Sequence, residues 1–442
     1  MASPRCGVDA ESSALSKAVA AQGVILRLWG PLALNWLMMA LEGPLLVALV
    51  SRLPEATANL AAFSVAFAIA LIVEAPVMML LSTSAALADD RPSYKRIARF
   101  ALALTLPLSG LMAIIGSPPV FRFLNDRLWH LPQPLSAWVA GAVWLLIPWP
   151  AVIGFRRLWQ GLLIRQGRSR LVAWGTVLRL AGMGAGATLA YAFSSWPGVW
   201  IAAMGLSAGV TTEMIAIRLW AQPVLGKLPA ETREAPLSYP QIGAFYTPLL
   251  LTSLLHVALT PLLTTLMAQG KEPLLSLAAY PPLTNTVFLF SCVGVAYQEV
   301  VIVLLGTRVG DQLLPFAHRI ALGSTLPLAL LNLPQVGHLW LSQVFAVPPP
   351  VEPLVQHSLL ILLPTPALIV YLAYLKGRFI RARKTLLNLL AALLELSAVL
   401  TLSLPLIRNT NLPAVYGATL ALLGARMAVL ALLWPLTRKV KV

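Results

Sequence analysis

The sequence predicts an all-α polytopic membrane protein, with about twelve transmembrane helices in two parallel six-helix lobes related by a pseudo-twofold axis. Three observations lead to this prediction: the composition, a series of long apolar runs and an internal repeat. Of the 442 residues, 58% are hydrophobic and 11% are charged, whereas a soluble domain carries about 25% charged residues. This composition excludes a cytosolic enzyme and a disordered chain, which would be poor in apolar residues.

Long apolar runs recur along the whole chain. A helix that crosses the hydrocarbon core needs roughly 20 mainly apolar residues. Twelve runs qualify, at residues 24–50, 57–86, 100–116, 135–163, 171–194, 197–221, 240–269, 274–305, 312–332, 352–375, 385–407 and 412–436. Prolines inside these runs are expected to kink the helices without ending them. The segment 1–22 is too polar for the core of a signal peptide, so the first run should insert uncleaved.

Basic residues predict the orientation. Lysines and arginines gather in every second connection, at residues 91–99, 165–170, 227–233, 308, 376–384 and 438–441. The remaining connections carry fewer: Arg52, Arg122, Arg127, Lys271 and Arg408. Cytoplasmic loops collect Lys and Arg, so we expect a multi-pass protein of the inner (plasma) membrane with both termini cytoplasmic. The net charge of +16 is then a signal of topology, and no nucleic-acid partner is expected.

An internal repeat divides the chain into halves. At an offset of 217, PLALNWLMMALEGP (31–44) aligns with PLLLTSLLHVALTP (248–261), and LAAF (60–63) aligns with LAAY (277–280). At an offset of 216, GLLIRQGRS (161–169) aligns with GRFIRARKT (377–385). Each half holds six spans, an even number, so both insert the same way up. The predicted parts are a cytoplasmic tail (1–22), an N-terminal lobe (23–222), a cytoplasmic linker (223–239), a C-terminal lobe (240–437) and a second tail (438–442).

Two outer connections support the repeat. Residues 117–134 and 334–350 are both short, aromatic and bounded by proline. Each can be a helix lying in the outer membrane interface or an ordered loop, and the sequence leaves both interpretations open.

Several of these segments resemble the multidrug/oligosaccharidyl-lipid/polysaccharide (MOP) exporter superfamily. They are the first span with Asn35, Glu42 and Pro44, the second span over Leu60–Pro76, and the basic turns IRQGRSR (164–170) and IRARK (380–384). Within the superfamily the pattern is similar to multidrug and toxic-compound extrusion (MATE) transporters and to the progressive ankylosis-like family, the latter around residues 148–170. The resemblance implies a V-shaped central cleft and an antiporter that exports an organic solute, as in multidrug efflux, by alternating access against H⁺ or Na⁺. MATE relatives tend to carry Asp on the first helix, where this chain has Glu42 displaced relative to the proline.

Other transporters and an enzyme are the alternatives. Two alternatives come from the same superfamily: an organic-anion exporter of the progressive ankylosis type and a lipid-linked saccharide flippase. The cleft of a flippase should be rich in Arg and Lys. A major facilitator transporter has a glycine in the loop after its second span, where DDRPSYKR (89–96) has Ser93. A membrane-embedded transferase or protease should show a clustered Asp/His/Arg motif, and none is evident. No phosphate-binding loop or hydrolase motif occurs either, so we expect no enzyme activity.

The expected partners are few. The five histidines have no ligand spacing, and Cys6 and Cys292 lie in unlike surroundings, so neither a metal site nor a disulfide is predicted. No cofactor is expected besides the coupling ion. We expect a monomer in the lipid bilayer with a small organic substrate.

Six ionisable residues fall near the middle of a predicted span: Glu42, Glu74, Arg179, His256, Glu395 and Arg426. Each costs at least about 2.5–3.5 kcal/mol on insertion scales, so each needs a reason. Glu42 lies seven positions after Asn35, which predicts that the two share a helix face. Asn35, Glu42 and Glu74 are therefore the candidates for ion coupling. The alternative is that the carboxyls only hold helices together.

The other four residues are candidates for a substrate cleft: Arg179, Glu395, His256 and Arg426. Arg179 and Glu395 occupy the same position of the repeat at an offset of 216. They are predicted to meet across the cleft, or else to be satisfied each within its own lobe. Arg156 and Glu213 are expected nearer the inner helix ends, where a long side chain can reach the interface.

Overall fold

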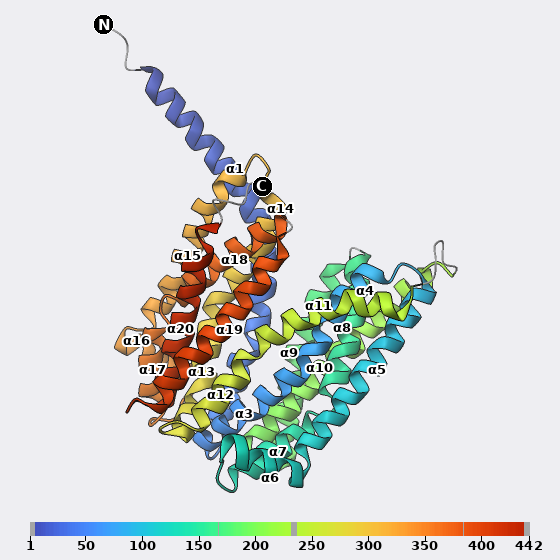
Figure 1. Cartoon of the computed structure of the whole chain (residues 1–442), viewed down its shortest axis with the longest axis vertical. Coiled ribbons are helices and arrows are strands. Elements are labelled where there is room, and N and C mark those ends of the chain that lie inside the picture. The colour runs from blue at the N-terminus through green and yellow to red at the C-terminus, as the bar shows by residue number, and fades with distance from the viewer. Residues whose placement is uncertain (1–4, 167, 231–236, 383, 437–442) are drawn as a thin grey trace.

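The molecule consists of two helical bundles that meet at one end and diverge at the other (Figure 1). The computed structural model describes residues 5–166, 168–230, 237–382 and 384–436, and in these ranges it has helices and no strand. The first described helix, α1, begins and the last, α20, ends on the side where the bundles diverge (Figure 1). We name the two bundles the N-lobe and the C-lobe.

The first half of the chain contains α1 (Arg5–Ala40), α2 (Glu42–Ser51), α3 (Ala56–Glu74), η1 (Ala75–Met79), α4 (Leu80–Leu87), α5 (Arg91–Gly116), α6 (Pro118–Leu124), η2 (Asn125–Trp129), α7 (Leu135–Leu145), α8 (Trp149–Arg165), α9 (Ser169–Phe193) and α10 (Gly198–Lys227). The second half contains α11 (Tyr239–Val257), α12 (Leu259–Ala268), α13 (Pro273–Val295), α14 (Tyr297–Leu304), η3 (Gly310–Gln312), α15 (Leu313–Leu330), α16 (Pro334–Leu339), η4 (Trp340–Val344), α17 (Glu352–Ile361), α18 (Thr365–Arg381), α19 (Thr385–Arg408) and α20 (Ala414–Leu433).

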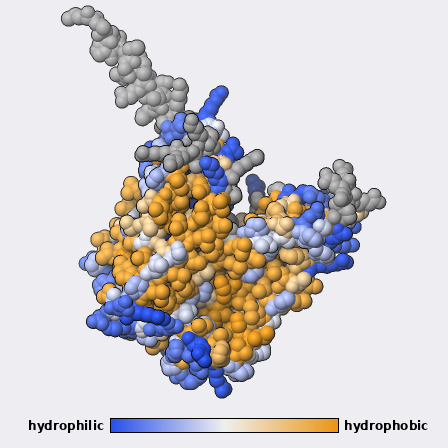
Figure 2. All heavy atoms as spheres, viewed as in Figure 1, coloured by the Kyte–Doolittle hydropathy of each residue, from blue (hydrophilic) through white to orange (hydrophobic). Residues whose placement is uncertain are grey.

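These helices account for the predicted spans. Within the described ranges, ten helices are long and apolar enough to cross a membrane, and an eleventh is the pair α17 and α18, bent by 44°. The remaining predicted span corresponds to α9, which has 25 residues. Exposed apolar side chains form a wide band over both lobes, with polar residues at the two ends (Figure 2). The protein is therefore a multi-pass membrane protein.

Most helix boundaries lie within a few residues of the predicted ones, but α5 begins earlier. Residues 91–99, predicted as a basic loop, form its first turns. The Asp90 side chain accepts a hydrogen bond from the Ser93 backbone N–H at 2.7 Å, and Pro92 lies in the first turn. An acceptor at the N-cap and a proline just inside both start helices.

The repeat is visible in single contacts. Glu55 and Glu272, which are equivalent positions of the repeat, both have positive φ and precede α3 and α13. The Asn59 carboxamide oxygen accepts from the Val199 N–H at 2.9 Å, and the Ser276 hydroxyl accepts from the Val415 N–H at 3.2 Å. The two outer connections both fold as a short helix followed by one π-helical turn, α6 with η2 and α16 with η4. Their helical interpretation is confirmed.

The first helix of each half crosses to the opposite lobe, which the sequence does not predict. The stretch of α1 around Trp29 packs on α13 and α14, where the Trp29 indole donates to the Val293 carbonyl at 3.0 Å. In the same way α11 lies against η1 of the N-lobe (Figure 1), and the Tyr246 hydroxyl donates to the Pro76 carbonyl. The two donors, Trp29 and Tyr246, are equivalent positions of the repeat at the offset of 217. The two acceptors, Val293 and Pro76, are related by the same offset. We call α1 and α11 the crossed helices.

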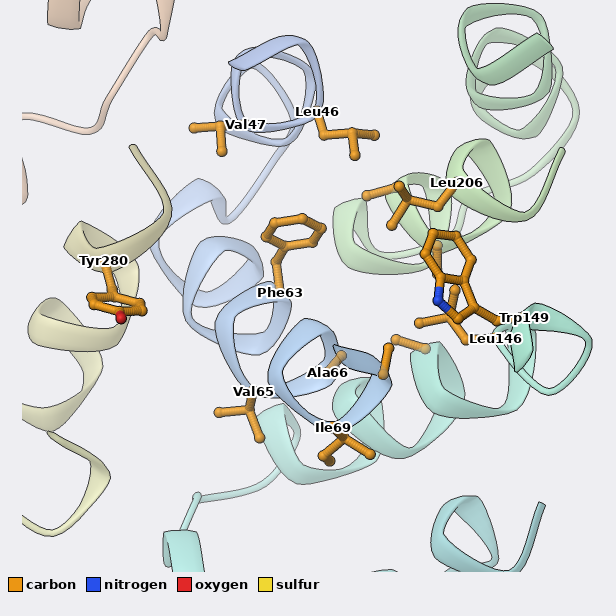
Figure 3. Packing of buried hydrophobic residues seen from close by; sticks show 14 of the residues in the cluster. Leu46, Val47, Phe63, Val65, Ala66, Ile69, Leu146, Trp149, Leu206 and Tyr280 are labelled. Atoms are coloured by element: carbon orange, nitrogen blue, oxygen red, sulfur yellow. The ribbon is translucent and has the colours of Figure 1, made fainter. Parts of the chain in front are cut away.

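The lobes meet along α3 and α13, in the region where the repeat matches best. Small residues at this contact, Ala61 and Ala62 on α3 and Ala278 and Ala279 on α13, are fully buried. The Ser64 hydroxyl donates to the Leu277 carbonyl at 2.6 Å. Small side chains let membrane helices approach closely, because lipid provides no hydrophobic force between them. Figure 3 shows α3 surrounded by α2, α7 and α10 of the N-lobe and by α13 of the C-lobe.

Candidate functional site

Glycines bring α9 and α10 together in the N-lobe. Gly182 and Gly186 on α9 face Thr212 and Ala208 of α10 so closely that a Cβ would lie 2.5 and 2.4 Å from their side-chain atoms. Gly209 on α10 would meet the Arg179 carbonyl at 2.7 Å. Two small-xxx-small pairs therefore pack backbone against backbone. This packing brings the Arg179 side chain within reach of Glu213, one turn beyond Gly209.

A chain of buried ion pairs runs through the N-lobe, and we call it the N-lobe network. It consists of Glu42, Arg156, Gln160, Arg179 and Glu213. Arg179 Nη2 lies 2.7 Å from Glu42 Oε2, and Arg179 Nε lies 3.6 Å from Glu213 Oε2. Glu213 also pairs with Arg156, and its Oε1 accepts from Gln160 Nε2 at 2.9 Å. The network links four helices, α2, α8, α9 and α10.

Glu74 lies beside this network at the end of α3. It is buried, and its Oε2 accepts a hydrogen bond from the Trp149 indole at 2.7 Å. It also interacts electrostatically with Arg156, Arg157 and Glu42. Arg157 has a second contact, with the Met78 sulfur at 3.6 Å. This part of the lobe therefore holds three carboxyl groups and three guanidinium groups.

The N-lobe network is not saturated with hydrogen bonds. Among the described side chains, the Nε atoms of Arg156 and Arg179 and the Oε1 atom of Gln160 are buried without a hydrogen-bond partner. The members also differ in access, since the Glu42 side chain is 16% exposed and the Glu213 side chain is 1% exposed. Glu42 is the more accessible carboxylate, and protonating it would leave Arg179 with the longer contact to Glu213.

Glu42 lies where the N-lobe touches the C-lobe. It begins α2 directly after the break from α1 at Leu41. The next residue, Gly43, packs so tightly on α13 that a Cβ would lie 1.6 Å from the Asn285 carboxamide oxygen. A change in the Glu42–Arg179 pair therefore acts on the helix that forms the contact between the lobes.

The C-lobe holds a separate polar cavity of about 270 Å³, which we call the C-lobe cavity. Its polar lining residues are Thr260, Tyr280, Thr284, Ser291, Glu395 and Arg426. Arg426 Nε donates to Glu395 Oε1 at 3.3 Å. The arrangement offers a cation, an anion and several hydroxyl groups to a ligand inside a largely apolar bundle.

The predicted pairing of Arg179 with Glu395 is wrong. Arg179 pairs with Glu42 and Glu213 inside the N-lobe, and Glu395 pairs with Arg426 inside the C-lobe. Each lobe satisfies the charge of its fifth span with a charge on a nearby helix. The polarity is reversed, with the cation on α9 and the anion on α10 in one lobe, and the anion on α19 and the cation on α20 in the other.

The placement of Arg156 and Glu213 at helix ends is also wrong. Both side chains are almost fully buried in the N-lobe network. The signal that could have found them is the spacing of Arg156 and Gln160, which places two polar groups one turn apart on one face of α8. The side chains of Asn35 and His256 lie outside the described part of the structure, although their backbones belong to α1 and α11. Among the described residues no group of His, Cys, Asp or Glu side chains is placed to hold a metal ion.

Comparison with solved structures identifies the architecture. The inward-facing conformation of a multidrug resistance MATE family transporter of the MOP superfamily superposes with a TM-score of 0.72, at 14% identity over 92% of this chain and 94% of that one. The outward-facing conformation of a multidrug resistance MATE family transporter gives a TM-score of 0.62, at 16% identity and 95% coverage of both.

A third match is a MOP superfamily transporter from Pyrococcus furiosus Vc1, described as having a binding pocket of reverse polarity that suggests a different function. Its TM-score is 0.62, at 15% identity and 95% coverage of both chains. No protein-family model and no curated protein matches the sequence. The structural likeness, at such low identity, concerns the fold and extends over almost the whole chain. The protein therefore has the two-lobed fold of the MATE transporters of the MOP superfamily.

Proposed function

We propose that the protein is a secondary active transporter that exports an organic solute from the cell by alternating access, coupled to an ion gradient. The observation that carries the proposal is the N-lobe network, a balanced set of buried charges that ends on the helix contacting the other lobe. The fold shared with MATE transporters supports it. The surplus of basic residues near the diverging ends of the lobes supports an orientation with that end in the cytoplasm.

The composition of the network favours H⁺ over Na⁺ as the coupling ion. Glu42 lies against Arg179, and Arg156 and Arg157 are in the same part of the lobe. A metal cation at Glu42 would be repelled by these guanidinium groups. A proton binds to a carboxylate oxygen and removes its charge, so it is the ion best suited to breaking the pair with Arg179. Release of Arg179 would free the beginning of α2 to move against α13.

The substrate would bind where the lobes provide polar groups away from the network. The C-lobe cavity combines Arg426, Glu395 and the hydroxyls of Tyr280 and two threonines. Such a mixed lining suits a small solute that carries charge and hydrogen-bonding groups. A lipid-linked saccharide flippase is less well supported, because its anionic diphosphate would need several unpaired cations, whereas Arg426 and Arg179 are both paired with carboxylates.

The test is gradient-driven flux in proteoliposomes, with organic cations and anions compared under an imposed pH gradient or Na⁺ gradient. We expect uphill flux with the pH gradient. Glu42→Gln removes the titrating group and keeps the size, so it should retain solute exchange without a gradient and lose uphill flux, because the contact with Arg179 no longer responds to a proton.

The matched control for Glu42→Gln is Glu55→Gln, an exchange at an exposed carboxylate between α2 and α3. It should leave uphill flux unchanged. Wild-type uphill flux in Glu42→Gln would reduce Glu42 to a structural role. Flux that follows the Na⁺ gradient and ignores pH would overturn the choice of proton.

A further inference from the structure

The end of the molecule where the lobes meet is held by two contacts that the repeat makes equivalent. At the end of α2, Arg52 Nη1 and Nη2 donate to the carbonyls of Val344 and Gln343 at 3.1 and 2.6 Å. At the end of α12, Gln269 Nε2 donates to the Leu128 carbonyl at 2.9 Å. Each bond joins the first span of one half to the π-helical turn of the other half. We call the two contacts the outer latches.

The equivalence extends to both sides of each latch. Arg52 and Gln269 are related by the same offset as the first spans of the two halves, and each directly follows the helix that ends its span. Leu128 and Val344 are related by the offset of the basic turns, and they lie in η2 and η4. Although the donors are chemically different, each half places a long side chain with an N–H donor on the same carbonyl position.

The π-helical turns explain why these carbonyls accept. In η2 the His130 N–H bonds to the Asn125 carbonyl, and in η4 the Phe345 N–H bonds to the Trp340 carbonyl. The last carbonyls of a helix have no N–H partner within that helix. Those of Leu128 and Val344 lie at such an end and point to the other lobe, where the latch donors satisfy them.

We infer that the outer latches are the gate that closes the outer side in this inward-open state, and that both must break for the protein to reach an outward-open state. The inference rests on the proposed alternating access. It goes beyond that proposal by naming the groups that set the balance between the two states. Both latches lie at the meeting end of the lobes, whereas the Trp29 and Tyr246 bonds of the crossed helices lie nearer the diverging end.

Spin labels at the outer end test the inference without any substrate. Cysteines replace Phe123 on α6 and Leu339 on α16, both exposed, in a chain in which Cys6 and Cys292 are changed to serine. Arg52→Ala with Gln269→Ala should shift the label distances toward a longer, outward-open population. Loss of the Gln269 latch, a single hydrogen bond, should change the ratio of the two states by roughly three- to tenfold. Loss of the Arg52 latch, which has two hydrogen bonds, should change it by more.

The control for these variants is Arg127→Ala, which removes an arginine of the same outer region whose guanidinium lies 5.7 Å from the ring of Phe123 in its own lobe. Because the label replaces Phe123, the control is measured with the N-lobe label moved to Arg122. It should leave the distances unchanged. If Arg52→Ala with Gln269→Ala gives the same label distances as the protein with intact latches, the inference is overturned.

A crosslink provides the opposite test. Arg52→Cys paired with Val344→Cys, or Gln269→Cys paired with Leu128→Cys, can be joined by a bifunctional thiol reagent that spans the latch. The joined protein, which carries no labelling cysteines, should lose gradient-driven flux and recover it after cleavage of the reagent. Full flux in the joined protein would overturn the gate while leaving the transport function intact. Absence of flux in the unaltered protein would count against the transport proposal, and the label distances would still judge the gate.

Discussion

At the residue scale, Glu213 is the centre of the N-lobe network. Its two oxygens contact Arg156, Arg179 and Gln160, and its side chain is almost completely buried. Removing the charge leaves two guanidinium groups short of a partner in low dielectric. Loss of one partner of a buried pair is strongly destabilising, whereas an exposed pair contributes little.

We therefore predict that Glu213→Gln lowers the stability of the folded protein by about 3–5 kcal/mol. The measurement is thermal unfolding in detergent, followed by retention of the monodisperse peak. The control is Asp89→Asn, which removes the carboxylate of an exposed pair with Arg165 and should cost less than about 1 kcal/mol. Equal unfolding temperatures for the two variants would show that the network contributes no more than a surface pair.

The sequence locates the buried charges better than their partners. Glu42, Glu74, Arg179, Glu395 and Arg426 are recognisable because a charge inside an apolar run needs compensation. Which charge compensates which depends on helix packing, and here the glycines of α9 and α10 decide it by drawing Arg179 toward Glu213. The repeat suggests a partner for Arg179 in the other lobe, whereas the nearest carboxylates lie on α2 and α10.

At the scale of elements, α2 of the N-lobe packs closely on α13 of the C-lobe. Gly43 faces Asn285, whose carboxamide nitrogen donates to the Pro281 carbonyl at 2.8 Å in its own helix. A larger side chain at position 43 cannot fit unless Asn285 moves or the two helices separate. The side chain at this position therefore affects the lobe contact directly.

Gly43→Val is predicted to destabilise the conformation seen here by about 1–3 kcal/mol, as overpacking does. Thermal unfolding and the label distances at the outer end should both report the change. Shortening the neighbour, in Gly43→Val with Asn285→Ala, should recover much of the loss because space becomes available. Gly30→Val on α1 is the control, since a Cβ there meets nothing within 4 Å. No recovery in the double variant would mean that the contact with Asn285 is not the cause.

The elements themselves follow closely from the sequence. Apolar runs predict the spans, because the length needed to cross the bilayer is fixed. A kink is expected at Pro76, and the structure has it as η1 between α3 and α4. The crossing of α1 and α11 to the opposite lobes is not predictable, because the faces of a helix in an apolar environment carry little pattern to show which neighbour each meets.

At the scale of the whole molecule, the proposed alternating access requires contacts between the lobes that allow two states. The lobes meet through small residues on α3 and α13 and through the outer latches, and they diverge at the opposite end (Figure 1). The contact between α3 and α13 carries the Ser64–Leu277 hydrogen bond among small buried residues. The N-lobe network, the packing of α2 on α13 and one of the two outer latches lie along the first span, at Glu42, Gly43 and Arg52.

The crossed helices also have a consequence for biosynthesis. The stretch of α1 around Trp29 is made long before its neighbours, because the surface that covers Ile25 and Trp29 belongs to α13, α14 and α15, which leave the ribosome much later. Residues 1–230 expressed alone should therefore accumulate poorly in the membrane, and co-expression of residues 231–442 should raise their amount several-fold, measured by blotting of membrane fractions. Equal amounts with and without the second half would contradict this. We therefore expect the two halves of the repeat, although each has six spans, to fold interdependently, because α1 is buried only after the second half has been made.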